Sequence, residues 1–353
     1  MVYRILICLA VALLVTTASV QPTATPIPTT LSASFAWAYR AGDYVRGRPA
    51  VSGSVAYVGA DDNAMHAVQA GTGEALWQYE TADNVTSSPL VLEGAIYFGS
   101  WDGAVYALDA ESGDLRWQYE TDGWVTASPV MGDGILYIGS HDGFLYALDV
   151  NDGALAWRYE TGGRIEGSAS VSEDLVFVGS ADDYLYALDQ ASGQLVWRER
   201  TGGEIVSTPA VAQGRVHVGS LDRTFYAFEA ASGQVRWTYE ADYAIESSPT
   251  VTGGIVYVGA NDGRLYALDA RDGRLLWTYQ ARDIVRSSPA AWDRFVFVGS
   301  DDGYLYGLDR ETGALAWKYR TGEAIAAGPT AVEGRLLVGS IDRRLHAFDL
   351  EAE

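Results

Sequence analysis

Cysteine and lysine are nearly absent from this chain, which has one residue of each among its 353. The single cysteine, Cys8, lies inside an apolar segment near the N-terminus, so the rest of the chain has no thiol for a disulfide, a zinc site or a nucleophile. The four histidines are scattered, and no phosphate-binding loop, nucleophile elbow or metalloprotease motif is present. These absences argue against a thiol-dependent enzyme, a phosphate-loop nucleotide enzyme, a hydrolase with a nucleophile elbow and a metalloprotease.

Positive charge is also scarce, because 24 Lys and Arg residues stand against 46 Asp and Glu residues, which gives a net charge of −22. A surface of this sign repels nucleic acid backbones and anionic membranes, so we expect no nucleic acid partner. The acidic residues are spread along the chain instead of being gathered in a tail. This distribution is typical of a solubilising surface on an exported protein.

Long hydrophobic runs are missing as well. The apolar run from Ile5 to Val15 follows Arg4 and precedes the small residues 16–18, which is typical of a secretory signal peptide. It is shorter than the ~20 residues that span a bilayer. We predict a signal peptide over residues 1–18, an extended Pro- and Thr-rich linker over residues 19–33, and a mature protein that is extracytoplasmic, either secreted or in the periplasm or cell envelope, without membrane insertion.

Tryptophan, in contrast, recurs at a constant interval of 40 residues, at Trp37, Trp77, Trp117, Trp157, Trp197, Trp237, Trp277 and Trp317. Glycines from Gly59 to Gly339 and aspartates from Asp62 to Asp342 keep the same period, and residues 34–353 divide into eight such units without an insertion. A repeat of about 40 residues is typical of a solenoid or a propeller.

Each unit contains four short β-rich runs. In the unit that starts at residue 85 they are residues 85–91, 95–100, 104–109 and 115–120, separated by turns rich in Gly and Asp. Seven of the ten prolines fall on the period in the first run, where only a strand with one free edge tolerates them. The sequence therefore predicts an all-β fold, an eight-bladed β-propeller of four-stranded blades over residues 34–353.

The two ends of the repeat region complete each other. The last unit stops after Asp349, before its fourth strand, whereas the segment from Ser34 to Tyr39 is a fourth strand without a blade. We therefore expect the N-terminal strand to close the ring by pairing with the C-terminal blade. Closure removes an exposed sheet edge, and we expect a monomer.

The segment from Ala107 to Trp117 resembles the tryptophan-docking motif of the quinoprotein-type (PQQ-like repeat) eight-bladed propeller family. The motif returns in most units, with Gln69 and Glu229 as departures from its aspartate. The resemblance implies that the eight periodic tryptophans are structural, each indole stacking on a glycine of a neighbouring motif. Equal units without insertions place the chain in the BamB-like, non-catalytic branch of that family.

The same resemblance raises PQQ with calcium as a cofactor, but the sequence lacks the adjacent cysteine pair and the insertions that build the cofactor pocket in such enzymes. We therefore predict no catalytic, cofactor-binding or metal residues. The periodic aspartates belong to turns in which Asp bonds its own backbone. His66 and His346 take a strand position that is tyrosine in the other six units, so we expect buried aromatic roles for both.

Function must then lie where the units differ. In a propeller, the loops that enter the innermost strands share one face with the turns between the second and third strands, and these positions vary most between units. Trp101, Trp124 and His141 should crowd one side of that face. The predicted partner-binding residues are Trp101, Trp124, His141, Tyr44, Arg46, Arg164, Glu166, Glu246 and Arg286.

These features favour an exported, non-catalytic module that binds or scaffolds proteins in the cell envelope. Two alternatives are a PQQ-dependent dehydrogenase-like or quinone-sensing protein, and a module that binds carbohydrate of the cell wall, which exposed tryptophans would suit.

Overall fold

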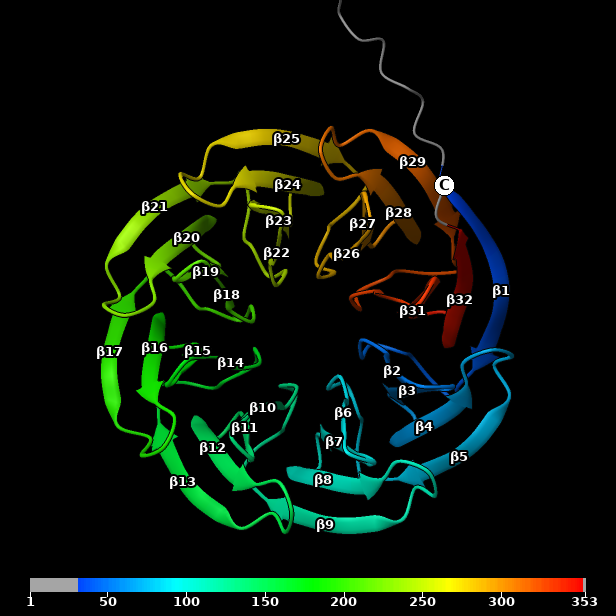
Figure 1. Ribbon diagram of the computed structural model, residues 1–353, viewed down its shortest axis with the longest axis horizontal. Helices are drawn as coiled ribbons and strands as arrows, with labels where there is room; N and C mark the ends of the chain where they lie inside the picture. The colour runs from blue at the N-terminus through cyan, green and yellow to red at the C-terminus, as the bar shows by residue number, and fades with distance from the viewer. Residues whose placement is uncertain (1–30, 352–353) are drawn as a thin grey trace, which may run out of the picture.

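The 40-residue units fold into four-stranded antiparallel sheets, which we call blades, arranged in a ring (Figure 1). The computed structural model describes residues 31–351. The signal peptide predicted for residues 1–18 and most of the predicted linker lie outside this range. No helix in the described range is long and apolar enough to cross a membrane.

The strands follow one another regularly along the chain. Blade 1 contains β2 (Ala50–Ser52), β3 (Val55–Ala60), β4 (Ala64–Gln69) and β5 (Ala75–Glu80); blade 2, β6 (Leu90–Leu92), β7 (Ala95–Gly99), β8 (Ala104–Asp109) and β9 (Leu115–Glu120); blade 3, β10 (Val130–Gly132), β11 (Ile135–Gly139), β12 (Phe144–Asp149) and β13 (Leu155–Glu160); blade 4, β14 (Ser170–Ser172), β15 (Leu175–Gly179), β16 (Tyr184–Asp189) and β17 (Leu195–Arg200).

The second half repeats the pattern. Blade 5 contains β18 (Ala210–Ala212), β19 (Arg215–Gly219), β20 (Thr224–Glu229) and β21 (Val235–Glu240); blade 6, β22 (Thr250–Thr252), β23 (Ile255–Gly259), β24 (Arg264–Asp269) and β25 (Leu275–Gln280); blade 7, β26 (Ala290–Trp292), β27 (Phe295–Gly299), β28 (Tyr304–Asp309) and β29 (Leu315–Arg320); blade 8, β30 (Thr330–Val332), β31 (Arg335–Ser340), β32 (Arg344–Glu351) and β1 (Ser32–Arg40).

The predicted closure is confirmed, because β1 forms the outer strand of blade 8. It pairs antiparallel with β32, from Ser32 opposite Glu351 to Arg40 opposite Arg344. The strand begins at Ser32, two residues before the predicted start of the propeller. Leu31 is already buried among aromatic residues of blades 7 and 8, and this packing draws the end of the predicted linker into the fold.

The first strand of each blade is shorter than predicted. In blade 2 it covers residues 90–92 instead of 85–91. The preceding residues make bonds outside any strand ladder: the Val85 N–H donates to the Ala60 carbonyl at 3.1 Å, and the Ser87 hydroxyl donates to the Gly99 carbonyl at 2.8 Å. Pro89 has no N–H to donate, so it lies ahead of the strand instead of within it.

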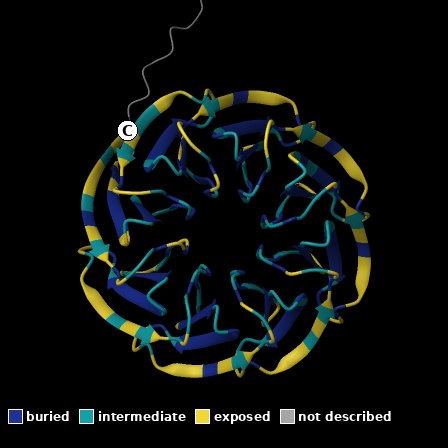
Figure 2. Cartoon of the chain, turned by 180° about the vertical axis from the view of Figure 1, so that it is seen from behind, coloured by how far each residue is buried: buried dark blue, intermediate teal, exposed yellow. Residues whose placement is uncertain are grey.

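The core lies between neighbouring blades. Second and third strands are buried along almost their whole length, whereas outer strands alternate between buried and exposed residues (Figure 2). Tyr97 and Trp117 of blade 2, for example, share one apolar cluster with Leu136 and Tyr146 of blade 3. Each sheet thus buries both faces against its neighbours, which explains strands that are apolar on both faces.

The periodic aspartates do more than the turn role that the sequence predicts. Asp102 accepts a hydrogen bond from its own turn, the Ala104 N–H at 2.9 Å. It also accepts from the Tyr106 hydroxyl at 2.8 Å and from the Ala82 N–H, in the loop after blade 1, at 3.0 Å. His66 and His346, both buried, replace the tyrosine and contact the equivalent aspartates. In seven of the eight blades the aspartate therefore ties the blade to the loop before it, and blade 6 is the exception within residues 31–351.

Seven of the eight periodic tryptophans contact the glycine turn of the next blade. The Trp117 Nε1 donates to the Val150 carbonyl at 3.1 Å, and a Cβ placed on Gly153 would lie 2.6 Å from the indole. Trp317 is the exception within residues 31–351, since no Nε1 hydrogen bond is formed and its ring packs edge-on against Phe348 at 5.1 Å. In blade 8 the chain continues as β32 to pair with β1, so the glycine turn is missing.

His217 occupies a fully buried position that is tyrosine in four other blades. There the tyrosine hydroxyl reaches a carbonyl of the next blade, as in Tyr137 to Gln190 at 3.1 Å, but both ring nitrogens of His217 lack a partner. Burial, together with the charge of the neighbouring Arg215, lowers the pKa of His217 to about 4. The buried imidazole therefore destabilises blade 5, because its two nitrogens have no hydrogen-bond partner.

We expect His217→Tyr to raise the free energy of unfolding at pH 7 by ~1 kcal/mol, because the hydroxyl gains the carbonyl of Ala270. The unfolded chain binds a proton with the ordinary pKa of about 6.5, so folding stability falls as pH drops from there towards 4, by up to ~3 kcal/mol. The substitution should remove this loss. Urea unfolding at pH 7 and pH 4.5 measures both effects.

The control is His217→Phe, which removes the titrating ring without supplying a hydroxyl, as in the natural Phe177 and Phe297. It should also lose the acid sensitivity, but without the gain at pH 7. If both variants lost as much stability as the parent between the two pH values, the titration of His217 would not be the cause.

Candidate functional site

The variable loops meet around a hollow of about 500 Å³ at one mouth of the ring. We call this side of the ring the variable face. Its residues come from loops that enter the innermost strands and from turns between second and third strands, as the sequence predicts. The hollow is lined by Arg46, Trp101, Trp124, Thr126, His141, Glu166, Val206, Glu246, Arg286 and Ala326.

Three rings from blades 2 and 3 form what we call the aromatic cluster: Trp101, Trp124 and His141. The two indoles stack with centroids 4.7 Å apart, and His141 lies 5.6 Å from Trp124. Hydrogen bonds fix two of the rings, from Trp101 Nε1 to the Thr86 hydroxyl at 2.8 Å and between His141 Nε2 and Thr126 at 2.9 Å. Trp124 keeps 49% of its surface exposed.

His141 contributes to this cluster as a neutral ring. Burial lowers its pKa below the ordinary value, and the nearby Glu166 carboxylate counteracts this only in part. The aromatic side of the hollow is therefore uncharged at neutral pH, and it offers large flat rings with anchored edges.

Two ion pairs lie in the loops and turns of blades 1 and 7. Arg46 binds Asp61 at 2.8 Å, and Arg286 binds Asp301 at 2.5 Å. Burial raises the pKa of both carboxyl groups, and the arginines offset this only in part. These pairs hold the guanidinium groups at the wall of the hollow.

The structure brings together seven of the nine residues that the sequence assigns to the partner-binding face. Tyr44 and Arg164 do not line the hollow. The guanidinium of Arg46 lies over the ring of Tyr44, and the distance from its Cζ to the ring centroid is 5.3 Å. Arg164 binds Glu166 and also Glu204, the latter at 2.8 Å, so it orders the loops of blades 4 and 5.

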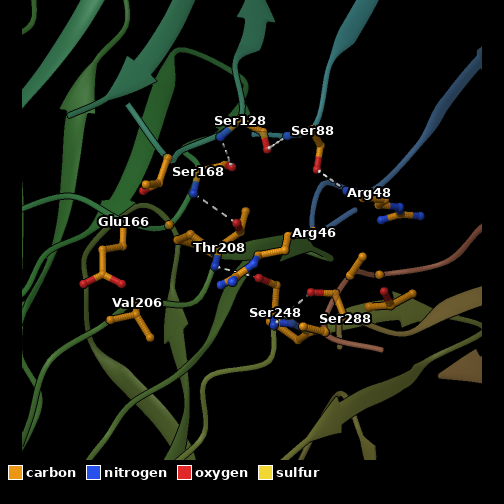
Figure 3. A pocket seen from close by; sticks show the side chains of 18 residues that line it. Arg46, Arg48, Ser88, Ser128, Glu166, Ser168, Val206, Thr208, Ser248 and Ser288 are labelled. Carbon is orange, nitrogen blue, oxygen red and sulfur yellow. Dashed lines mark hydrogen bonds between the residues drawn. The ribbon is translucent and has the colours of Figure 1, made fainter. Parts of the chain in front are cut away.

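The sequence-based prediction does not include a second set of residues, which lies deeper in the channel. Hydroxyl side chains stand immediately before five of the periodic prolines, and before Ala169 in blade 4, and line a cavity of about 400 Å³ that Arg46 and Arg48 also line (Figure 3). Their spacing of 40 residues was the available signal. We call them the hydroxyl ring: Ser88, Ser128, Ser168, Thr208, Ser248 and Ser288.

Carboxylates near the mouth are already engaged. Glu166 binds Arg164, and Glu246 accepts a hydrogen bond from Asn261 at 2.6 Å. Across residues 31–351, no group of three or more His, Cys, Asp or Glu residues is placed to hold a metal ion. Calcium requires six to eight oxygen ligands, and these side chains do not form such a set.

Known proteins resemble this chain in sequence repeats and in fold. A family model described as "Outer membrane protein assembly factor BamB" matches residues 28–169, 121–210, 202–291 and 282–352. No curated protein sequence matches the chain. Among solved structures, BamB from Moraxella catarrhalis is 21% identical, with a TM-score of 0.79 over 90% of this chain and 100% of that one.

Two further structures share the fold. A computationally designed protein is 18% identical, with a TM-score of 0.81 over 90% of this chain and 99% of that one. Quinohemoprotein alcohol dehydrogenase from Comamonas testosteroni is 17% identical, with a TM-score of 0.77 over 91% of this chain and 77% of that one. The fold is therefore shared by proteins with different activities, and the repeats carry the assignment: the chain belongs to the BamB family of PQQ-like repeat propellers.

Proposed function

We propose that this protein is a non-catalytic protein-binding module of the cell envelope and that it captures its partner on the variable face. One observation carries the proposal: two stacked indoles stand beside a hollow, and Trp124 is half exposed. Binding hot spots favour tryptophan, because a rigid ring buries a large area at a small entropic cost.

Family membership supports the cell envelope as the place of action. The matching family model is described by its role in outer membrane protein assembly. The signal peptide expected from the sequence would bring the chain to the same compartment. We propose extracytoplasmic localisation on these two grounds.

The geometry of the cluster favours a protein over the other candidate ligands. The indoles stack on one another, so each has one flat side occupied, and Arg46 and Arg286 line the same hollow. Aromatic residues with arginine are typical of protein interfaces. Equal blades without inserted loops supply no lid for a redox cofactor.

We expect the double variant Trp101→Ala, Trp124→Ala to weaken partner capture by about 100-fold or more, since each hot-spot truncation costs ~2 kcal/mol or above. The partner is first identified by mass spectrometry of proteins that co-purify with the parent from the envelope fraction. Calorimetry with the purified partner then gives the dissociation constants. Thermal unfolding should change little, because Trp124 is half exposed and Trp101 is only partly buried.

The matched control is Trp292→Ala. Trp292 lies at the end of β26, on the side of the ring opposite the variable face, so its truncation should leave capture unchanged. Equal capture by the double variant and the parent would contradict the proposal. Micromolar, calcium-dependent binding of PQQ would favour the quinone alternative, and retention on cell-wall glycan without any protein partner would favour the carbohydrate alternative.

A further inference from the structure

Hydrogen bonds link the hydroxyl ring from blade to blade around the channel. In each bond a backbone N–H donates to the hydroxyl 40 residues ahead, as from Ser88 to Ser128 at 2.8 Å and from Ser128 to Ser168 at 2.8 Å (Figure 3). The series runs from the Arg48 N–H to the Ser288 hydroxyl, with donor-to-acceptor distances between 2.8 and 3.3 Å. At six of the eight positions, the backbone N–H therefore has a hydroxyl acceptor in the next blade.

The series is interrupted where blades 7, 8 and 1 meet. The N–H of Ser288 would donate to a side chain at position 328, but Gly328 has none. The N–H of Gly328 would donate to a side chain at position 48, but Arg48 has no acceptor atom. Two backbone donors in the described channel wall are thus left without the partner that the other blades provide.

Arg48 fills the space that the glycine leaves open. A Cβ on Gly328 would lie 3.5 Å from the Arg48 Cδ, so the side chain crosses over this glycine. Its Nε donates to the Thr330 hydroxyl at 3.2 Å, which anchors the guanidinium two residues along the chain from Gly328. The terminal N–H groups are not used by any hydrogen bond within residues 31–351.

The charge of Arg48 is uncompensated. Arg46, Arg164 and Arg286, on the variable face, each bind a carboxylate, whereas Arg48 forms no ion pair within the described chain. The Arg48 side chain is exposed to the channel, and the protein atoms around the channel lower the pKa of its guanidinium. In a protein of net charge −22, this arginine therefore keeps its charge and its terminal N–H groups open to a ligand in the channel.

We propose that this gap is a carboxylate-binding site. The guanidinium of Arg48 presents two parallel N–H groups, which match the two oxygens of a carboxylate. The free N–H groups of Ser288 and Gly328 supply further donors on the same wall. The proposal concerns the inner channel and does not depend on the aromatic cluster or on its partner.

The test is a titration of the full mature protein with sodium malonate at constant ionic strength, followed by amide NMR. The signals of Ser288 and Gly328 should shift and saturate with a millimolar or tighter dissociation constant. In Arg48→Ser the affinity should fall by about tenfold or more, because the ion pair is lost. Serine also offers Gly328 the hydroxyl acceptor found in other blades, so this variant should fold; Arg48→Gln is the second variant.

The charge-matched control is Arg158→Ser, on the outer strand β13, which removes one exposed cation far from the channel and should bind malonate like the parent. A blocked Gly-Glu-Gly tripeptide tests the source of the carboxylate. A shift with the tripeptide indicates a side chain of a protein, and a shift with malonate alone indicates a free small molecule. No saturable shift in the parent, or an equal shift in both Arg48 variants, overturns the proposal.

Discussion

Deletion of residues 31–40 is expected to lower the free energy of unfolding by more than ~5 kcal/mol and to open the ring. The deletion removes β1, which contributes the buried side chains of Leu31 and Trp37 and the whole outer edge of blade 8. Loss of one large buried side chain alone costs ~3–5 kcal/mol. Thermal and urea unfolding of the mature protein with and without this segment measure the effect.

The deletion should also change the oligomeric state. Without β1, strand β32 presents unpaired N–H and C=O groups, and such an edge pairs readily with another chain. Size-exclusion chromatography should therefore show dimers or larger species. A protein that begins at residue 31 is the control and should behave like the mature parent. Equal unfolding midpoints for the two shortened proteins would show that closure contributes nothing to stability.

The number of blades and the closure could be predicted because they depend on the period alone. A 40-residue unit without insertions leaves one arrangement for each strand, and a C-terminal unit that lacks its fourth strand needs the N-terminal one. The start of the first strand could not be predicted in this way. Val85 and Ser87 form part of an extended run in the sequence, but their bonds go to Ala60 and Gly99, which only the packed ring brings near.

The variable face was predictable for a similar reason, since topology alone places the loops and turns on one side. The direction in which each side chain points could not be predicted from the topology. Arg164 turns to Glu204 of the next blade, and Tyr44 lies against Arg46, so neither lines the hollow. The role of Arg48 also depends on a neighbour 280 positions away, Gly328, whose missing side chain makes the gap. Contacts between blades decide the positions of Arg164 and Arg48, and a single unit does not contain these contacts.

The tryptophans give the second large expected effect, and the ring supplies its own comparison. Trp117→Ala removes an 8%-exposed indole, its hydrogen bond to Val150 and its contact with Gly153, so we expect a loss of ~3–5 kcal/mol in the free energy of unfolding. Trp317→Ala should cost less by at least ~1 kcal/mol, because Trp317 has no such bond and no glycine turn to cover.

Trp117→Phe separates the two contributions of the docked indole. Phenylalanine keeps an aromatic ring over Gly153 but has no N–H for the Val150 carbonyl, so it should lose ~1 kcal/mol for the hydrogen bond and a further part for the smaller ring. Urea unfolding of the three variants under one condition gives the comparison. If Trp117→Ala and Trp317→Ala cost the same, burial within the blade would explain the effect, and docking onto the next blade would add nothing to it.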